Sequence, residues 1–421
     1  MADNNFFARQ ELLISKLAGL MIKNLRIMIF GLGAIGCEIL KNLVLMGFRH
    51  FLLVEMDRIE PSNLSKSILY GPDGIGLPKV EVAARKAREL ALAEDVDIQT
   101  IDGNLITQVG MGVYLEYDIA IIAVDTMDGR ADINDKCVLT GTPFFEVGFR
   151  GYNGDVCFFA PEGPMQQQDG TIIDKLPTSD GRFPKMLGKF PVCLREEIGT
   201  GNFDGTRHSC SGFKVKDKDL EKIPAIQTGA ALVAALMCQE LVKYLDGKDT
   251  LRNKMLLFHG LPLETLIVSY SRNPKCTIHD RELNLVTVPI PRGATIREAL
   301  QAIGGTLDGD ILLSLPDDFI LSADCHCCGK KIPIGARGHE VWDYQRWCPE
   351  CRAAYPDYAS RINYKTNLVK IPREVSLASP EDVLNRRLSD VGVPENDILE
   401  CIVTKDGTPD FFDVYLKSLD V

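Results

Sequence analysis

Short apolar runs alternate with amphipathic stretches over the first part of the chain. This alternation predicts parallel strands joined by helices. The run 25–30 is too short for a buried helix and is followed by glycine, so it predicts a central parallel strand. A helix is expected over about 34–46 and the next strand over 51–54. The segment 158–219 has little periodicity and is rich in Pro, Gly and Asp, which predicts a long connecting loop.

The pattern changes beyond residue 285. VTVPIPRGATIREALQAIGG predicts a strand, a Pro-Gly turn and a short amphipathic helix, and DILLSL predicts the next strand. The tail from Lys365 predicts another strand, an amphipathic helix in SPEDVLNRRLSDVG with Ser379 as its N-cap, and a final strand followed by a helix. We therefore expect two domains, 1–285 and 286–421. The predicted fold class is α/β, Rossmann-like, with an appended α+β domain.

Composition narrows the class of protein. The chain has 421 residues, of which 45% are hydrophobic and 25% charged, so it can bury a substantial core. A net charge of −11 without a basic run argues against nucleic acid as a partner. We find no apolar stretch of membrane-span length and no signal-peptide pattern at the N-terminus, so we expect a cytoplasmic protein with no membrane partner. In that reducing compartment, 13 cysteines favour metal and thiol chemistry over disulfides.

A glycine motif follows the first predicted strand. Gly31, Gly33 and Gly36 have the G-x-G-x-x-G spacing, which permits a tight turn, close approach of backbone to a phosphate, and close packing of helix on strand. Glu55, at the end of the next strand, is placed to accept hydrogen bonds from ribose hydroxyls. This motif alone also fits a dinucleotide oxidoreductase.

The glycine motif is one of an ordered set of motifs over about a hundred residues. After the glycines come EMDRIEPSNLSKS, then IGLPK, then AVDTMDGR, and ARQELL precedes them all. GFRGYNGDVCFFAPEG and IPAIQTGAALVAALMCQELVKYLDG lie downstream. In this order the chain resembles the superfamily of ubiquitin-like-protein activating enzymes, which includes the ThiF, MoeB and HesA adenylyltransferases. The resemblance covers roughly the first 280 residues. The charged residues after Glu55 have no role in hydride transfer.

The resemblance implies a role for each matching residue. Asn63, Lys66, Lys79 and Arg9 would hold the phosphates of ATP, with Arg9 reaching across a homodimer interface. Asp125 would hold Mg²⁺, Glu55 the ribose, and Asp57 would stand nearby on the phosphate or metal side. The sequence departs from the family at three positions, where Glu55 replaces Asp, Lys66 replaces Arg and Ser67 replaces Gln. Lysine keeps the charge but loses the bidentate fork of arginine.

Two cysteines are candidates for a thioester. Cys210 lies shortly before the closing helix, where the resemblance places a reactive cysteine, and the neighbouring Arg207 and His208 favour the thiolate. Cys193, in KFPVCLREE, resembles the catalytic cysteine of the two-domain activating enzymes, or alternatively one member of a family zinc pair. We favour Cys210. Cys37, Cys137 and Cys238 lie on apolar elements and are expected to be inert.

Two C-x-x-C pairs in the second domain predict a zinc ribbon over about 323–356. The spacing fits four thiolates around Zn²⁺, with Cys325, Cys328, Cys348 and Cys351 as ligands and Cys327 as the spare. Cys276 and His279 stand where family members have another C-x-x-C pair, which would make them half of a further zinc site.

The implied function is ATP-dependent adenylation of the C-terminal glycine carboxylate of a small ubiquitin-like protein, followed by transfer to an enzyme cysteine as a thioester. ATP, Mg²⁺ and Zn²⁺ are the expected cofactors, and a conjugating enzyme is a candidate thioester acceptor. One alternative is adenylation of a sulfur-carrier protein without a stable thioester. Another is a non-catalytic scaffold subunit of an activating complex.

Overall fold

The computed structural model describes residues 6–198, 226–325, 328–337, 348, 350–351 and 367–419. The chain packs as two compact units. Unit 1 comprises Met1–Ile106 and Tyr114–Glu282, and unit 2 comprises Thr107–Val113 and Leu283–Val421. The main boundary between the units lies between Glu282 and Leu283. The sequence did not predict that Thr107–Val113 belongs to the second unit.

Unit 1 is built on an eight-stranded sheet in the order β11-β10-β6-β5-β4-β1-β2-β3. The five strands β3, β2, β1, β4 and β5 are parallel, and β6, β10 and β11 continue the sheet in antiparallel pairs. The strands are β1 (Arg26–Phe30), β2 (His50–Glu55), β3 (Asp97–Asp102), β4 (Ile119–Ile122), β5 (Phe144–Arg150), β6 (Asn153–Phe159), β10 (Lys254–His259) and β11 (Glu264–Ser269). The first two match the sequence prediction closely, because buried apolar runs between turn residues specify parallel strands.

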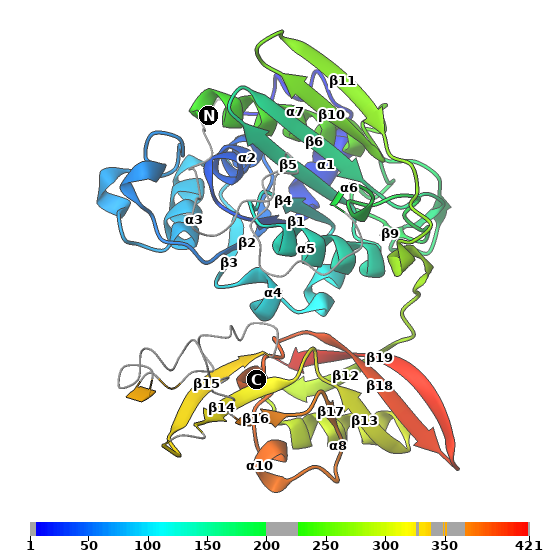
Figure 1. Cartoon of the computed structure of the whole chain (residues 1–421). Helices are drawn as coiled ribbons and strands as arrows, with labels where there is room; N and C mark the ends of the chain where they lie inside the picture. The colour runs from blue at the N-terminus through cyan, green and yellow to red at the C-terminus, as the bar shows by residue number, and fades with distance from the viewer. Residues whose placement is uncertain are drawn as a thin grey trace. The chain divides into compact units, whose positions relative to one another are not determined.

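Helices cover both faces of this sheet (Figure 1). On one face, α2 and α7 pack together, and their side chains share a core with Ile27, Phe145 and Phe158. On the other face α5 follows β4. The unit 1 helices are α1 (Lys16–Asn24), α2 (Ala34–Leu45), α3 (Lys79–Leu90), α5 (Met127–Thr140), α6 (Arg195–Ile198) and α7 (Gln227–Leu245). The short helix α4 (Leu105–Gln108) begins in unit 1 and ends in the segment Thr107–Val113 of unit 2.

Helix α7 corrects one expectation from the sequence. Among the described residues, it alone is long and apolar enough, by length and composition, to cross a membrane. Half of that apolar window is buried, and α7 packs on α2, β5 and β6. Core burial accounts for its apolar sequence, since a helix packed between a sheet and a second helix is apolar on most of its surface.

The segment predicted as a long loop contains only short elements where it is described. It has a small sheet of β7 (Met165–Gln166), β8 (Ile172–Ile173) and β9 (Lys185–Met186), followed by α6. Residues 199–225, which include Arg207, His208 and Cys210, lie outside the described residues.

Unit 2 has a five-stranded sheet, ordered β12-β19-β18-β13-β17, and a three-stranded sheet, ordered β15-β14-β16. Helix α8 has a capping box between Thr295 and Glu298 and buries Ile296, Leu300 and Ile303. The elements are β12 (Leu285–Pro291), α8 (Ile296–Leu307), β13 (Asp310–Ser314), β14 (Phe319–Asp324), β15 (Lys331–Arg337), β16 (Asn367–Ile371), β17 (Glu374–Val375), α10 (Glu381–Leu384), β18 (Ile398–Lys405) and β19 (Thr408–Leu419).

The end of unit 2 differs from the prediction in two places. The final strand and helix are in fact two antiparallel strands, β18 and β19, joined at Asp406 and Gly407. Both residues have positive φ, as the tight hairpin turns that Asp-Gly favours require. The helix predicted in SPEDVLNRRLSDVG is the four-residue α10, whose N-cap is Pro380. Ser379 instead accepts a hydrogen bond from Ser376 N at 3.1 Å.

Candidate functional site

The glycine motif forms the turn between β1 and α2. Gly31 has φ +88°, and a Cβ there would lie 2.6 Å from the carbonyl oxygen of Ala123. A Cβ at Gly36 would lie 2.0 Å from the carbonyl oxygen of Gly31. Both positions therefore require glycine. No described side chain caps the N-terminus of α2, where the first N–H groups of a helix lack intrahelical partners. This end of α2 can bind an anion.

Glu55 lies at the carboxyl end of β2, next to this turn. Its Oε2 accepts a hydrogen bond from Leu32 N at 2.9 Å, and its Oε1 accepts from Met56 N at 2.8 Å and Asp57 N at 3.0 Å. An ionised carboxylate offers about four acceptor sites, so Glu55 can still accept from ribose hydroxyls. Glu55, which is predicted to bind the ribose, therefore lies at the glycine turn.

The loop after β2 is closed at its base by two predicted site residues. Lys79 Nζ lies 2.9 Å from Asp57 Oδ2, and Lys79 N donates to Asp57 O at 3.0 Å. Lys79 is buried and begins α3, while Asp57 is exposed. The Asp57 carboxylate gives the buried Lys79 ammonium a counter-charge. The pair fixes both ends of the loop that carries Asn63 and Lys66.

Within that loop, Asn63 takes part in a capping box. Its Oδ1 accepts from Glu60 N at 2.9 Å, so its amide nitrogen is the group that would donate to phosphate. Lys66 is half-buried. Ser67 is buried, and its hydroxyl has no hydrogen-bond partner among the described residues.

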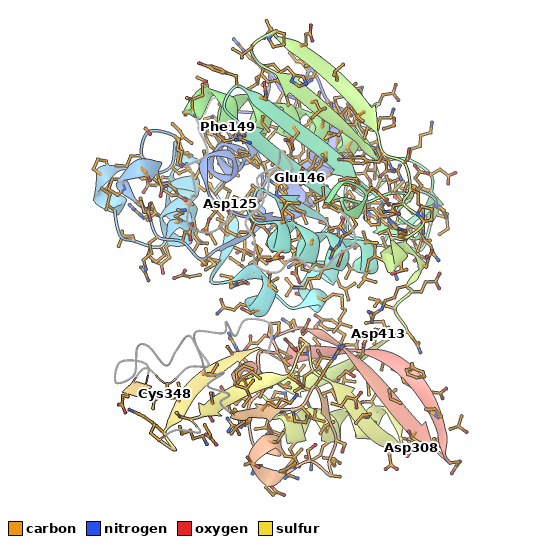
Figure 2. All side chains as sticks on the ribbon, viewed as in Figure 1. Asp125, Glu146, Phe149, Asp308, Cys348 and Asp413 are labelled. Atoms are coloured by element: carbon orange, nitrogen blue, oxygen red, sulfur yellow. The ribbon has the colours of Figure 1, made fainter. Side chains whose placement is uncertain are left out.

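Asp125 follows β4 and is exposed. Figure 2 labels Asp125 and Glu146, which come from neighbouring parts of the sheet. Strands β2 and β4 flank β1, so Glu55, the glycine turn and Asp125 all follow the carboxyl ends of adjacent parallel strands. In open α/β sheets, ligands bind outside these strand ends, where the strand order reverses. Here the reversal falls between β1 and β4.

A buried ion pair that the sequence did not predict supports Asp125. Arg130 on α5 pairs with Glu146 on β5, and the two side chains are only 6% and 2% exposed. Arg130 Nε also donates to the carbonyl oxygen of Val124 at 3.0 Å. The pair therefore braces the turn just before Asp125. Arg130 stood in the motif AVDTMDGR, but nothing in the sequence indicated its partner.

We expect Arg130→Met to lower the free energy of unfolding by about 3–5 kcal/mol, because it leaves the Glu146 carboxylate buried without a counter-charge. The double variant Arg130→Met/Glu146→Gln is the control, and it should recover most of that loss. Urea denaturation of the two proteins measures the difference. Equal losses in the single and double variants would mean that the ion pair is not the cause.

Two buried groups lie beside the glycine turn. Burial raises the pKa of the Cys37 thiol to about 12, so Cys37 is protonated and inert, as predicted. Burial raises the pKa of Tyr70 well above its usual range. The Tyr70 phenol is therefore a neutral hydrogen-bond donor. Cys137 and Cys238 are also buried.

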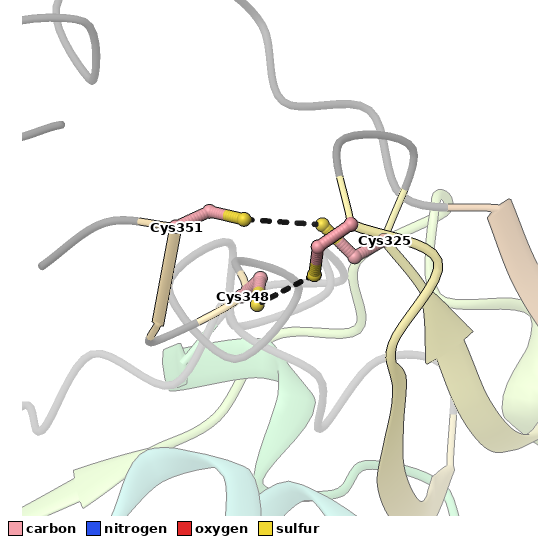
Figure 3. A group of neighbouring side chains, drawn as sticks. Cys325, Cys348 and Cys351 are labelled. Atoms are coloured by element: carbon pink, nitrogen blue, oxygen red, sulfur yellow. Dashed lines mark hydrogen bonds between the residues drawn. The ribbon is translucent and has the colours of Figure 1, made fainter. Parts of the chain in front are cut away.

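The predicted zinc cysteines converge in unit 2 (Figure 3). The sulfurs of Cys325 and Cys351 are 3.8 Å apart and those of Cys328 and Cys348 are 3.7 Å apart. All four sulfurs lie within 4.8 Å of one another. Tetrahedral Zn²⁺ with Zn–S bonds of about 2.3 Å would place its sulfurs about 3.8 Å apart. The four thiols therefore fit one zinc ion. Cys327 lies outside the described residues.

A second group of metal-ligand type joins Cys193 and Glu196 to Cys276 and His279, with ligand atoms within 4.8 Å of one another. The two sulfurs are 4.0 Å apart, and His279 Nε2 is 3.2 Å from Glu196 Oε1. His279 Nδ1 lies 3.1 Å from the carbonyl oxygen of Phe190. A proton on Nδ1 leaves the Nε2 lone pair for a metal. The sequence had identified three of these residues but not Glu196.

Two other predicted site residues, Arg9 and Cys193, are not brought to the glycine turn. Arg9 is exposed in the turn region before α1, and no described contact links it to the glycine turn. Cys193 is fully buried, at 0% exposure. Its surroundings suit a metal ligand better than a thiol that must reach an adenylate.

The comparisons with known proteins agree with the motif order. The model of the ThiF family matches residues 7–278. The chain belongs to the ThiF family. The resemblance inferred from the sequence is thereby confirmed, and the match spans nearly all of unit 1. The sheet, the glycine turn and the helices on both faces are the Rossmann-like ThiF fold of this chain.

Curated relatives of this ThiF chain include a sulfur carrier protein adenylyltransferase and subunits of activating enzymes. The sulfur carrier protein adenylyltransferase of Thermus thermophilus is 26% identical over 61% of this chain and 83% of its own length. The NEDD8-activating enzyme E1 catalytic subunit of Dictyostelium discoideum is 25% identical over 66% of this chain and 73% of its own. SUMO-activating enzyme subunit 2 of the same organism is 33% identical over 32% of this chain, but this match spans only 20% of that subunit.

Solved structures of E. coli MccB are also similar. The one with AMPCPP and selenomethionyl MccA has a TM-score of 0.49 and 17% identity, over 67% of this chain and 75% of that chain.

Proposed function

We propose that this chain activates the C-terminal carboxylate of a small ubiquitin-like or sulfur-carrier protein by ATP-dependent adenylation. The observation that carries the proposal is the meeting of the glycine turn, Glu55, the Asp57–Lys79 pair and Asp125 at the carboxyl ends of adjacent parallel strands. The named activities of the sulfur-carrier, SUMO and NEDD8 relatives support it.

The first step is nucleotidyl transfer. A carboxylate oxygen of the small protein attacks the α-phosphorus of ATP, and the bond to the bridging oxygen of pyrophosphate breaks. Lys66, Lys79 and the amide of Asn63 would hold the phosphate oxygens, because cations and hydrogen-bond donors placed beforehand stabilise the charge that develops there. Asp125 fits Mg²⁺, which needs few protein carboxylates and would neutralise phosphate charge when bound.

The second step is transfer to a cysteine. The thiolate of Cys210 would attack the acyl carbonyl carbon, and AMP would leave with the phosphate oxygen. A conjugating enzyme would then accept the acyl group. One alternative is adenylation without a thioester. Another is a scaffold role, which the departures at Lys66 and Ser67 leave open and the presence of Asn63, Lys79 and Asp125 argues against. We also propose a homodimer in which each Arg9 completes the partner's phosphate site.

ATP–pyrophosphate exchange with candidate small proteins ending in Gly-Gly tests the proposal. We expect exchange that depends on both Mg²⁺ and the small protein. A purified chain that binds the small protein but never catalyses exchange would support the scaffold alternative.

We further propose that the four-cysteine group of unit 2 and the group of Cys193, Glu196, Cys276 and His279 each bind Zn²⁺, so we expect two zinc ions per chain. Structural zinc contributes folding free energy, and loss of a thiolate from a closed four-ligand site disrupts that contribution. Cys348→Ser should therefore remove one zinc, increase hydrogen exchange beyond about residue 320 and leave ATP binding unchanged. Elemental analysis and hydrogen exchange measure these effects.

His279→Ala is the matched variant for the other group, and it should remove one zinc from unit 1 alone. Purified wild-type chain without zinc would contradict both assignments.

A further inference from the structure

Leu32, between Gly31 and Gly33, is held through both its N–H group and its carbonyl group. Leu32 N donates to Glu55 Oε2 at 2.9 Å, and the carbonyl oxygen of Leu32 accepts a hydrogen bond from the Tyr70 hydroxyl at 2.6 Å. Cys37 Sγ lies 3.4 Å from the same oxygen. Tyr70 is 7% exposed and comes from the loop after β2, 38 residues along the chain. This loop therefore reaches back to the turn.

The hydrogen bond from Tyr70 to Leu32 also determines the direction of the N–H group of the next residue, Gly33. The peptide bond is planar and trans, so the Leu32 carbonyl and the Gly33 N–H point in opposite directions. With the carbonyl directed at Tyr70, the Gly33 N–H points away from Tyr70. Gly33 immediately precedes α2, whose N-terminus is the anion-binding end of the turn.

Glycine at position 33 would permit the Leu32–Gly33 peptide to flip. Rotating it would change φ of Gly33 from its value of −74° to a positive one, which glycine adopts at little cost. A flipped peptide would direct the Leu32 carbonyl oxygen, instead of an N–H, to the side where phosphate binds. An oxygen there would repel a phosphate.

We propose that Tyr70 is a positioning residue for ATP: its hydroxyl holds the Leu32–Gly33 peptide in the orientation that binds phosphate. The inference rests on the proposed function for its nucleotide. It adds a residue that lies outside the charged set predicted from the sequence. Tyr70 touches neither the phosphates nor the small protein in this account, and it acts through the backbone of the turn.

Tyr70→Phe tests this, because it removes only the hydroxyl. The hydrogen bond contributes on the scale of a single buried bond, so we expect ATP to bind roughly 3- to 10-fold more weakly, with KM for ATP rising and kcat nearly unchanged. Adenosine, which has no phosphate, should bind equally to both proteins. Calorimetric titration with ATP and with adenosine measures the two affinities.

Tyr114→Phe is the matched control. Tyr114 is fully buried and stacks on Phe30, but its hydroxyl has no hydrogen-bond partner within the described part of the chain. Removing that hydroxyl should leave ATP affinity unchanged.

Three results would overturn the inference: unchanged ATP affinity in Tyr70→Phe, an equal loss for ATP and adenosine, or an equal loss in Tyr114→Phe. Wild-type chain that binds ATP but catalyses no pyrophosphate exchange would contradict the proposed function. The ATP and adenosine titrations would still test the role of Tyr70 in that case. A wild-type chain that binds no ATP would contradict both the proposed function and the role of Tyr70.

Discussion

Asp125→Ala is expected to reduce Mg²⁺-dependent pyrophosphate exchange by roughly 100-fold or more, which is the scale of losing one group that stabilises charge in the transition state. Asp125 is exposed and follows β4, so its loss should leave the core and the melting temperature intact. The Arg130–Glu146 pair continues to brace the turn in this variant. Exchange rates and thermal melts of the purified variant measure both effects.

Asp249→Ala is the control for Asp125, because Asp249 is also an exposed aspartate but lies after α7, away from the glycine turn. It should exchange at the wild-type rate. A folded Asp125→Ala variant with normal exchange would remove Asp125 from the site.

Cys210→Ala is expected to abolish a thiol-sensitive band that carries the small protein while leaving pyrophosphate exchange at the wild-type rate. Adenylation needs only the phosphate-binding residues, whereas the thioester needs a thiolate that can reach the adenylate. A non-reducing gel after incubation with ATP and the small protein shows the band, and dithiothreitol should remove it.

Cys193→Ala is the comparison variant. Cys193 is fully buried beside Cys276, so its loss should cost a metal ion and spare the band. If Cys193→Ala loses the band and Cys210→Ala keeps it, the assignment of the two cysteines is reversed. A wild-type protein that forms no band would favour adenylation without a thioester.

Elements of the first unit were predictable where the signal is local. The predicted helix over 34–46 is α2 at Ala34–Leu45, and the strand predicted over 51–54 is β2 at His50–Glu55. Prediction failed at the end of unit 2. The sequence there has an apolar run followed by a turn, and this pattern is compatible either with a strand and a helix or with a hairpin. The hairpin prevails there because the positive φ of Asp406 and Gly407 returns β19 alongside β18, which buries Val414 and Leu416.

The sequence by itself determined the family, the glycine turn, the identity of the charged residues near it and the four cysteines of unit 2. These depend on spacing within short segments, where backbone geometry leaves few alternatives. Only the tertiary structure decided which distant residues meet. Arg130 with Glu146, Tyr70 with Leu32, and Cys193 with Cys276, 83 residues apart, are pairs that no local spacing specifies. Burial of an ionic or polar group costs free energy unless a partner compensates it, and for these pairs the packing of the whole sheet and its helices selects the partner.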